Sequence, residues 1–319
     1  LLAIVVVALA ATNLFAGSVA VQSPDGHVVA LFEVRNGELF YSVSKGERPV
    51  VGPSKMEIFV GAKMSIVEQS IRENDTVWSP VYGQFSSIRD RHRELALSLT
   101  ADVTPVKLLC RAFDTGIGSR FVLSKESLDK ELSFSTGYKV LNNVATYSGQ
   151  RGAKAGSLAK AVRVSVPLVT ERKDGLHVAL LESDLYSAAG FESMQIRFSA
   201  VAKTLVAASS AVSIGEGQLT PWRVVLIGET AGDLTVNTVA LNLAAPCRLA
   251  DTRWIRPGKG LWDWRIHGYN NGEFVYGIDT RSYLHLIDFC AEQGLQYLSL
   301  IHISEPTRRT IPSRMPSSA

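Results

Sequence analysis

The chain has 319 residues, of which 46% are hydrophobic and 20% are charged, and its formal net charge is +3. This composition excludes an intrinsically disordered chain, and the small net charge without a basic run gives no support for a nucleic-acid partner. The three cysteines, Cys110, Cys247 and Cys290, are widely separated. Their spacing argues against a zinc site or a disulfide framework and favours buried free thiols.

The first twenty residues contain no charged side chain and begin with an apolar run. They end in Ser18-Val19-Ala20, a small-x-small pattern of the kind that signal peptidase cleaves. The stretch is too short and too interrupted for a membrane span. We therefore predict that residues 1–20 are a partial signal peptide and that the protein is exported, to the periplasm or the exterior, with no membrane span in the mature chain.

Residues 21–250 have the pattern of a mainly β domain. Pro24-Asp25-Gly26 and Arg35-Asn36-Gly37 are typical of turns, and Leu39, Tyr41 and Val43 form one apolar face after the second turn. Further strands, most of them rich in β-branched or aromatic residues, are predicted at 56–60, 94–100, 106–114, 120–123, 161–169, 177–182, 194–198, 222–227 and 239–243. So many strands exceed a small sandwich and predict a large two-sheet one.

Residues 251–297 change to a strand, a polar and aromatic loop, a helix and the start of a second strand. The helix begins at Asp279 or Thr280 as N-cap and ends before Gly294, which supplies a left-handed C-terminal position. Apolar side chains recur in it at helical spacing, at Tyr283, Leu286, Ile287 and Cys290. A strand–helix–strand order predicts a parallel pair, as in a barrel or a doubly wound sheet.

The last segment, residues 298–319, is expected to be non-native. Residues 298–308 are similar to the translation of a transposon-derived sequencing adapter, and residues 313–319 resemble the adjoining primer site. The segment holds three arginines and one glutamate, so the net charge without it is +3 − 2 = +1. The native chain is then predicted to be interrupted after about Tyr297.

Two short motifs have ordinary explanations. Phe113-Asp114-Thr115-Gly116 resembles the active-site loop of aspartic proteases, but such an enzyme needs two copies and a Ser or Thr after the glycine, where Ile117 stands. A turn between two strands is the favoured interpretation. Asn74-Asp75-Thr76 fits a glycosylation acceptor but is expected to be a polar turn.

Glu182 follows an apolar strand and is close to Asp184 and a loop of small residues. These carboxylates could be hard oxygen ligands for calcium. On residue chemistry alone, a solvated carboxylate at the end of a strand is the favoured interpretation.

Trp262-Asp263-Trp264 stands at the predicted end of the first strand after residue 251. Binding residues of parallel barrels lie at such strand ends, and tryptophan stacks against the apolar face of a sugar ring. We therefore predict that Trp262, Asp263 and Trp264 bind substrate. Core aromatics that close the barrel are an equally good interpretation of each tryptophan alone.

Eight segments, in their order and spacing, resemble glycoside hydrolase family 97, the bacterial exo-acting α-glucosidases and α-galactosidases. The segments are Ser23-Pro24-Asp25-Gly26, Phe113-Asp114-x-Gly116 with Arg120-Phe121, Pro167-Leu168-Val169-Thr170, Glu182-Ser183-Asp184-Leu185, Thr220-Pro221-Trp222-Arg223, Leu241-Asn242, Trp254-Ile255-x-Pro257-Gly258-Lys259, and Trp262-Asp263-Trp264 through Ile287-Asp288-Phe289. The resemblance covers residues 21–297.

The resemblance implies a β-super-sandwich over residues 21–250 and the first βα unit of a truncated (β/α)8 barrel over residues 251–297. It also implies a calcium ion, Ca²⁺, held by glutamates, with Glu182 as one ligand. The expected activity is hydrolysis of an oligosaccharide or another α-glycoside by two carboxylates on later barrel strands, so no residue here is assigned as catalytic. A non-catalytic carbohydrate-binding sandwich is the alternative.

Overall fold

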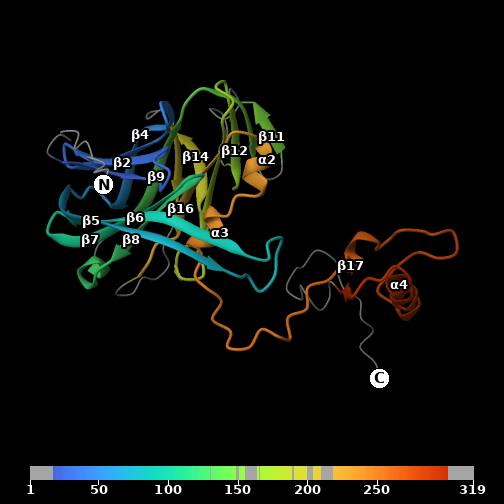
Figure 1. Cartoon of the computed structure of the whole chain (residues 1–319). Coiled ribbons are helices and arrows are strands. Elements are labelled where there is room, and N and C mark those ends of the chain that lie inside the picture. Colours follow the sequence, from blue (N-terminus) through green and yellow to red (C-terminus); the bar gives the residue numbers. More distant parts are fainter. Residues whose placement is uncertain are drawn as a thin grey trace, which may run out of the picture. The chain divides into compact units, whose positions relative to one another are not determined.

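A computed structural model describes residues 17–129, 131–148, 151–154, 164, 166–188, 190–199, 204–209 and 218–300. The chain divides after Cys247 into two compact units. The first unit contains two large antiparallel sheets (Figure 1). This confirms the prediction of a mainly β, two-sheet fold.

The two sheets of the first unit have seven and nine strands, and every pairing within them is antiparallel. In spatial order, the seven-stranded sheet contains β1 (Ser18–Gln22), β2 (Val28–Arg35), β3 (Glu38–Lys45), β4 (Arg48–Phe59), β9 (Leu132–Val140), β15 (Thr204–Ala208) and β14 (Gln195–Ser199). The nine-stranded sheet contains β11 (Arg151–Lys154), β10 (Asn143–Ser148), β12 (Leu168–Arg172), β13 (His177–Ser183), β16 (Trp222–Gly228), β8 (Gly116–Leu123), β7 (Thr104–Phe113), β6 (Ile88–Ala101) and β5 (Met64–Trp78). A short 3₁₀ helix, η1 (Lys125–Asp129), follows β8.

The β2–β3 hairpin shows how the sequence sets the register. Asn36 and Gly37 both have positive φ angles, 52° and 78°, as a two-residue hairpin turn requires. The turn pairs Arg35 with Glu38, so every second residue after it faces inward. The apolar face predicted for this strand is accordingly buried in the main core between the sheets.

A second, smaller core lies on the outer face of the nine-stranded sheet. Trp222, Val224 and Leu226 of β16 face it, while Val225 and Ile227 belong to the main core. Two short helices, α2 (Ala231–Thr235) and α3 (Val239–Leu243), follow β16, and Val239 and Leu243 complete the outer core.

The prediction of a strand at residues 239–243 is therefore wrong, because this segment is the helix α3. A short apolar run does not distinguish a strand from a helix by periodicity. The side chain of Asn237 accepts a hydrogen bond of 2.9 Å from the main-chain N–H of Val239 and so starts the helix. Gly118 makes room for it, since a Cβ there would lie 2.3 Å from Cδ1 of Leu243.

The predicted strand at residues 161–169 is also displaced. The structure begins β12 at Leu168, directly after Pro167, which lacks a main-chain N–H for a ladder hydrogen bond. Val164 forms only an isolated bridge to Ile196, and residues 161–163 and 165 lie outside the described residues.

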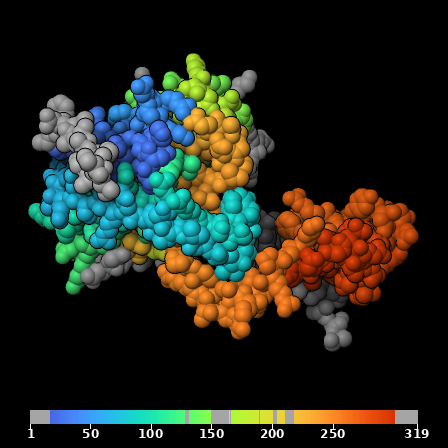
Figure 2. Space-filling model, viewed as in Figure 1, coloured from blue at the N-terminus to red at the C-terminus, as the bar shows by residue number. Residues whose placement is uncertain are grey.

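The longest strand, β5, was not predicted. It is an edge strand whose residues are mostly exposed on both faces, so its sequence has no apolar alternation. Figure 2 shows this part of the chain at the surface, in light blue to cyan. Asn74-Asp75-Thr76, expected to be a turn, lies inside β5 and pairs with β6. The turn expected at Asp114-Thr115 is confirmed and joins β7 to β8.

Strand β1 begins at Ser18 and pairs with β2. Three of its residues therefore precede the predicted mature start at Val21, and Val19 is buried in the main core. Residues 1–16 lie outside the described part of the chain, so the signal peptide stays a prediction. No helix among the described residues is long and apolar enough to cross a membrane.

The second unit contains the expected strand–helix–strand unit. Strand β17 (Gly260–Trp262) pairs in parallel with β18 (Tyr297–Ser299), and η2 (Asp263–Arg265) and α4 (Thr280–Glu292) lie between them in sequence. Asp279 is the N-cap and Gly294 has a φ of +64°, as predicted. Strand β18 includes two residues of the predicted non-native tail, and residues 301–319 lie outside the described ranges.

Candidate functional site

Glu182 is the predicted metal ligand, and it occupies the next-to-last position of β13. Side chains alternate along a strand, so it points to the same side of the sheet as Val178 and Leu180 of the main core. Only 5% of its side chain is exposed. Its register partner on β16 is Arg223.

Both carboxylate oxygens of Glu182 already accept hydrogen bonds. The main-chain N–H of Met194 donates to Oε1 at 2.9 Å and to Oε2 at 3.0 Å. Nη1 of Arg223 donates to Oε2 at 3.0 Å and forms an ion pair. Burial raises the pKa of the Glu182 carboxyl above its ordinary value, and the Met194 N–H and Arg223 act in the opposite direction.

Arg223 is held in place by the opposite sheet. Its side chain is 1% exposed, and Nη2 donates a hydrogen bond of 2.8 Å to the hydroxyl of Ser209, which follows β15. Its guanidinium carbon lies 4.1 Å from the ring centroid of Phe134 on β9. The Glu182–Arg223 pair therefore connects the two sheets inside the sandwich, a structural role that does not require a bound ion.

The described residues around Glu182 do not fit a calcium site as they are arranged. Calcium takes six to eight oxygen ligands at about 2.3–2.6 Å. Here the nearest partners of the carboxylate are N–H donors, one of them on a cation. No group of three or more His, Cys, Asp or Glu side chains that could hold a metal occurs in the described ranges.

Asp184, which the sequence also placed at this strand end, has a different environment. Its φ of +60° turns the chain out of β13. Its side chain is 3% exposed. The carboxylate accepts a hydrogen bond of 2.9 Å from Nη1 of Arg120 and one of 3.1 Å from the main-chain N–H of Ala245. Asp184 thus fixes the segment after α3 against the nine-stranded sheet.

Trp222 of the Thr220-Pro221-Trp222-Arg223 segment lies between two guanidinium groups on the outer face of this sheet. The guanidinium carbons of Arg111 and Arg120 are 5.2 and 4.2 Å from its ring centroid. A fully buried indole flanked by two cations is a packing arrangement stabilised by cation–π attraction. On its outer face β16 thus carries the ring and β7 and β8 supply the cations, whereas on its inner face β16 supplies the cation, Arg223, to Phe134.

The three predicted substrate-binding residues follow one another at the end of β17. Trp262 is the last residue of the strand, whereas Asp263 and Trp264 belong to the 3₁₀ turn η2 after it. Trp264 was predicted on the strand itself, but the strand ends two residues earlier, at Trp262. The guanidinium of Arg265 lies 5.5 Å from the Trp262 ring.

Asp263 joins this strand end to α4. It is buried, and its Oδ2 accepts a hydrogen bond of 3.1 Å from the hydroxyl of Tyr283. Burial, together with the neighbouring Asp263 carboxylate, raises the pKa of Tyr283 to about 12. The sequence therefore predicted correctly that Asp263 stands at the strand's end, and the structure adds that its carboxylate orients the helix.

Residues 21–246 match the family model described as the glycosyl-hydrolase 97 N-terminal domain. The chain belongs to glycoside hydrolase family 97. The matched range begins within β1, covers the rest of the sandwich and ends directly before the boundary between the two units.

Curated relatives of this family 97 chain are similar over most of its length. A retaining α-galactosidase of Bacteroides thetaiotaomicron is 25% identical over 332 residues, which cover 87% of this chain and 49% of the relative. A probable retaining α-galactosidase of Streptomyces bingchenggensis is 27% identical and covers 83% of this chain and 43% of the relative. The chain thus spans about half the length of these curated relatives.

Solved structures show the same fold. A family 97 enzyme from Pseudoalteromonas sp. strain K8, in complex with acarbose, has a TM-score of 0.74 at 23% identity and covers 88% of this chain and 47% of its own. A β-arabinopyranosidase has a TM-score of 0.71 at 16% identity, with coverages of 88% and 50%. At these identities the likeness concerns the fold.

Sequence reasoning missed Arg223 as the partner of Glu182 in this family 97 domain. The Thr220-Pro221-Trp222-Arg223 segment carried the resemblance but was given no role. The pairing could have been found only from the register of β13 with β16, which aligns these residues across 41 positions of sequence. Such a non-local register is not encoded in any short motif.

Proposed function

We propose that the chain is part of an exported, calcium-dependent, exo-acting α-glycosidase that hydrolyses terminal α-glucosidic or α-galactosidic bonds. One observation carries the proposal: the unit that matches the family 97 N-terminal model is followed at once by a parallel strand–helix–strand unit. A (β/α)8 barrel begins with this arrangement. A non-catalytic carbohydrate-binding sandwich, the second candidate, gains nothing from it.

Trp262, Asp263 and Trp264 are the proposed substrate-binding residues. They stand at and just after the carboxyl end of β17, the edge at which barrel enzymes bind their substrates. The indole of Trp264 is half-buried, which leaves part of a flat apolar surface for the C–H face of a sugar. Asp263 would act here as a positioning residue, because Tyr283 already holds its carboxylate.

The chemistry we propose uses two carboxylates of the complete protein. One protonates the oxygen that leaves, and the other is a nucleophile or a base. The curated relatives are named retaining α-galactosidases, which favours a nucleophilic role for the second carboxylate and an α-galactoside as the substrate. Solved relatives are named as complexes with acarbose and panose. We assign none of these chemical roles to a residue of this chain.

Calcium belongs to the proposal through the family resemblance, and export belongs to it through the N-terminal segment. Glu182 is the proposed ligand, and to bind the ion its carboxylate would have to exchange Arg223 for calcium. The apolar residues 1–20 support export.

The proposal is tested by assaying the complete protein on 4-nitrophenyl α-galactoside and α-glucoside, with the 319-residue chain as the control. We expect the complete protein to release 4-nitrophenol and the 319-residue chain to release none. If the complete protein binds α-galactosides or α-glucosides without hydrolysing them, the carbohydrate-binding alternative replaces this proposal. If it neither binds nor hydrolyses them, both are wrong.

A further inference from the structure

A pocket of about 540 Å³ opens on the first unit beside the β5–β6 hairpin. Its walls come from the end of β5, the start of β6, the last part of β7 and the segment that includes and follows α3. The lining includes Trp78, Asp90, Arg111, Leu241, Asn242, Ala244, Pro246 and Cys247. The volume is in the range of small-ligand sites.

The hairpin wall of this pocket is fixed at two points. Nε1 of Trp78 donates a hydrogen bond of 2.8 Å to the side-chain oxygen of Asn242, whose Nδ2 donates 2.9 Å to the main-chain oxygen of Arg89. Nε2 of Gln84, in the loop between β5 and β6, donates a hydrogen bond of 3.1 Å to the main-chain oxygen of Thr235. The indole is thus held in position while 37% of Trp78 stays exposed. A fixed and partly open aromatic ring provides a stacking surface before any ligand binds.

The two charged side chains of the pocket are already paired. Oδ1 of Asp90 lies 2.8 Å from Nδ1 of His92, and Nε of Arg111 donates a hydrogen bond of 2.7 Å to the carboxylate of Glu94. The pocket therefore offers an acceptor and donors in fixed positions without a net charge that would select an ion. The remaining wall, with Leu241, Ala244 and Pro246, is apolar.

We propose that this pocket binds a neutral saccharide. A pyranose has one face of C–H groups, which matches Trp78 and the apolar wall, and a rim of hydroxyls, which match Asp90 and Arg111. The inference depends on no step of the proposed hydrolysis. It can succeed or fail in the 319-residue chain, to which we assign no catalytic residue.

Cys247 supplies a reporter at the rim of the pocket. It is an exposed free thiol, contrary to the expectation that all three cysteines are buried, whereas Cys110 and Cys290 are buried. The rate at which iodoacetamide alkylates Cys247, followed by peptide mass spectrometry, therefore reports whether the pocket is filled. The peptides of Cys110 and Cys290 show in the same sample whether the fold has opened.

The test measures this rate with maltotriose, raffinose or benzyl alcohol. At a sugar concentration about ten times the dissociation constant, we expect one of the two sugars to slow alkylation of Cys247 about tenfold. Trp78→Ala should abolish the protection, and Trp254→Ala, which removes an exposed tryptophan of the second unit, should preserve it. Ala244→Phe, which narrows the pocket at an exposed position without removing a polar group, should weaken protection even if Trp78→Ala does not fold.

Three results would overturn the proposal. The first is an alkylation rate that neither sugar changes, whether it is fast or slow without sugar. The second is protection by benzyl alcohol but by neither sugar, which would make the pocket an apolar site. The third is equal protection in the wild-type chain and in Ala244→Phe.

Discussion

The main-chain N–H of Asp25 donates a hydrogen bond of 3.0 Å to Oδ1 of Asp114. This contact joins the turn between β1 and β2 to the turn between β7 and β8, and so links the two sheets at one end. Nη1 of Arg91 lies 3.2 Å from the other oxygen of Asp114. The Asp114 motif that resembles a protease loop is therefore a connector between turns.

Asp114→Ala should lower the free energy of unfolding of the first unit by about 1–2 kcal/mol, because it removes the acceptor of the Asp25 N–H and the partner of Arg91. Asp114→Asn keeps an acceptor oxygen and should therefore lower the free energy of unfolding by less than Asp114→Ala does. Urea denaturation followed by tryptophan fluorescence measures both. Equal losses for the two variants would show that the charge, rather than the hydrogen bond, stabilises the turn.

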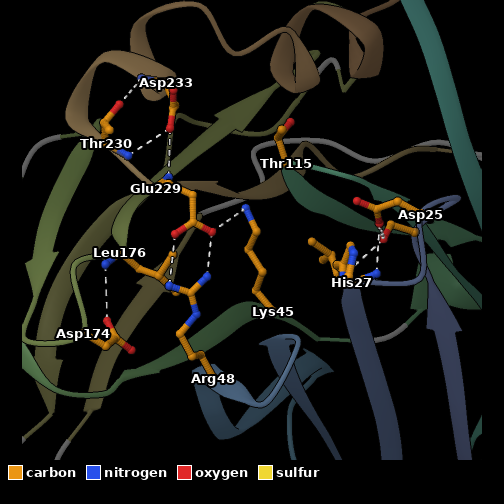
Figure 3. Close-up of polar contacts among 12 residues, drawn as sticks. Asp25, His27, Lys45, Arg48, Thr115, Asp174, Leu176, Glu229, Thr230 and Asp233 are labelled. Atoms are coloured by element: carbon orange, nitrogen blue, oxygen red, sulfur yellow. Dashed lines mark hydrogen bonds and ion pairs between the residues drawn. The ribbon is translucent and has the colours of Figure 1, made fainter.

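A similar connector involves Arg172 and Asp174 at the β12–β13 turn. The side chain of Arg172 is fully buried, and its Nε and Nη2 donate hydrogen bonds to the Asp174 carboxylate. Its Nη1 donates a hydrogen bond of 3.1 Å to the main-chain oxygen of Val50 on the opposite sheet. Asp174 also accepts from the Leu176 N–H at 3.3 Å (Figure 3). Arg172 holds the pKa of Asp174 below its ordinary value of 3.8.

Asp174→Asn should destabilise the first unit at neutral pH by about 2–3 kcal/mol. This is less than the 3–5 kcal/mol that breaking a fully buried pair costs, because Asp174 is partly exposed. Since the folded-state pKa of Asp174 is below the unfolded value, its stabilising effect is complete above pH 3.8 and is lost as the pH falls through the folded-state pKa. Unfolding free energies of wild type and variant should therefore converge at low pH. A difference that stays constant down to the acid limit would contradict the prediction.

Glu229 makes the corresponding contact near α2, and it provides a matched comparison. Its carboxylate accepts hydrogen bonds of 2.6 and 3.0 Å from the guanidinium of Arg48 and lies 3.2 Å from Nζ of Lys45. Both cations are at the β3–β4 turn (Figure 3). About half of the Glu229 side chain is exposed. Glu229→Gln should therefore change the unfolding free energy by less than about 1 kcal/mol. A loss as large as that of Asp174→Asn would mean that burial of the cation does not decide the effect.

The glycine of the Asp114 motif is required by close packing. Gly116 has a φ of +155°, and a Cβ there would lie 2.4 Å from the main-chain oxygen of Val225. Gly116→Ala should destabilise the first unit by more than about 2 kcal/mol, because a strand backbone would have to shift. Gly26→Ala is the control: its φ is +78°, and nothing lies within 4 Å of its Cβ, so only about 1 kcal/mol of backbone strain is expected. Thermal unfolding compares the two, and a larger loss at Gly26 would show that strain outweighs packing.

The sequence predicted those parts of the fold that depend on local pattern. The Asn36-Gly37 turn, the Asp279 cap and the buried face of β3 all follow from residue type and spacing. Strand β5 and helix α3 could not be predicted in the same way. One is an edge strand with little burial on either face, and the other is an apolar run too short for its period to be recognised.

The candidate site was predicted only as residue types at strand ends. Glu182 and Asp263 are where the sequence placed them, but their partners, Arg223 and Tyr283, come from other elements. Whether a carboxylate is free to bind a ligand depends on the register of its strand with the next one. That register follows from the packing of whole sheets, which a motif does not report.

The Glu182–Arg223 pair gives opposite expectations for the isolated chain and for the complete enzyme. In the 319-residue chain, Glu182→Gln should lower the unfolding free energy by about 3 kcal/mol, since it leaves the buried Arg223 without its counter-charge. Adding calcium should change the stability of neither form, because no described group fits the ion. Calcium-dependent stabilisation of the wild-type chain that is lost in Glu182→Gln would show that Glu182 exchanges Arg223 for the ion.

For the complete enzyme, we predict that chelating calcium, or replacing Glu182 by Gln, lowers the rate of hydrolysis of aryl α-glycosides. Unchanged rates in both experiments would remove Glu182 and calcium from the proposed function. Arg172→Lys is a suitable control, because it disturbs a buried arginine that contacts Asp174 instead of Glu182. It should affect stability without changing how the activity depends on calcium.

The second unit exposes apolar side chains on α4 and should associate through them. Leu284 and Ile287, three positions apart, share an exposed face, and Phe289 is exposed on another side of the helix. Helical spacing had placed Ile287 on the buried face, whereas only Leu286 and Cys290 of that set are buried. An exposed apolar helix face favours association. We expect the 319-residue chain to express poorly and to form oligomers in size-exclusion chromatography. Ile287→Lys should increase the monomer fraction, whereas Arg281→Lys, an exposed change on the same helix, should not. A wild-type chain that is monomeric at high yield would refute this prediction.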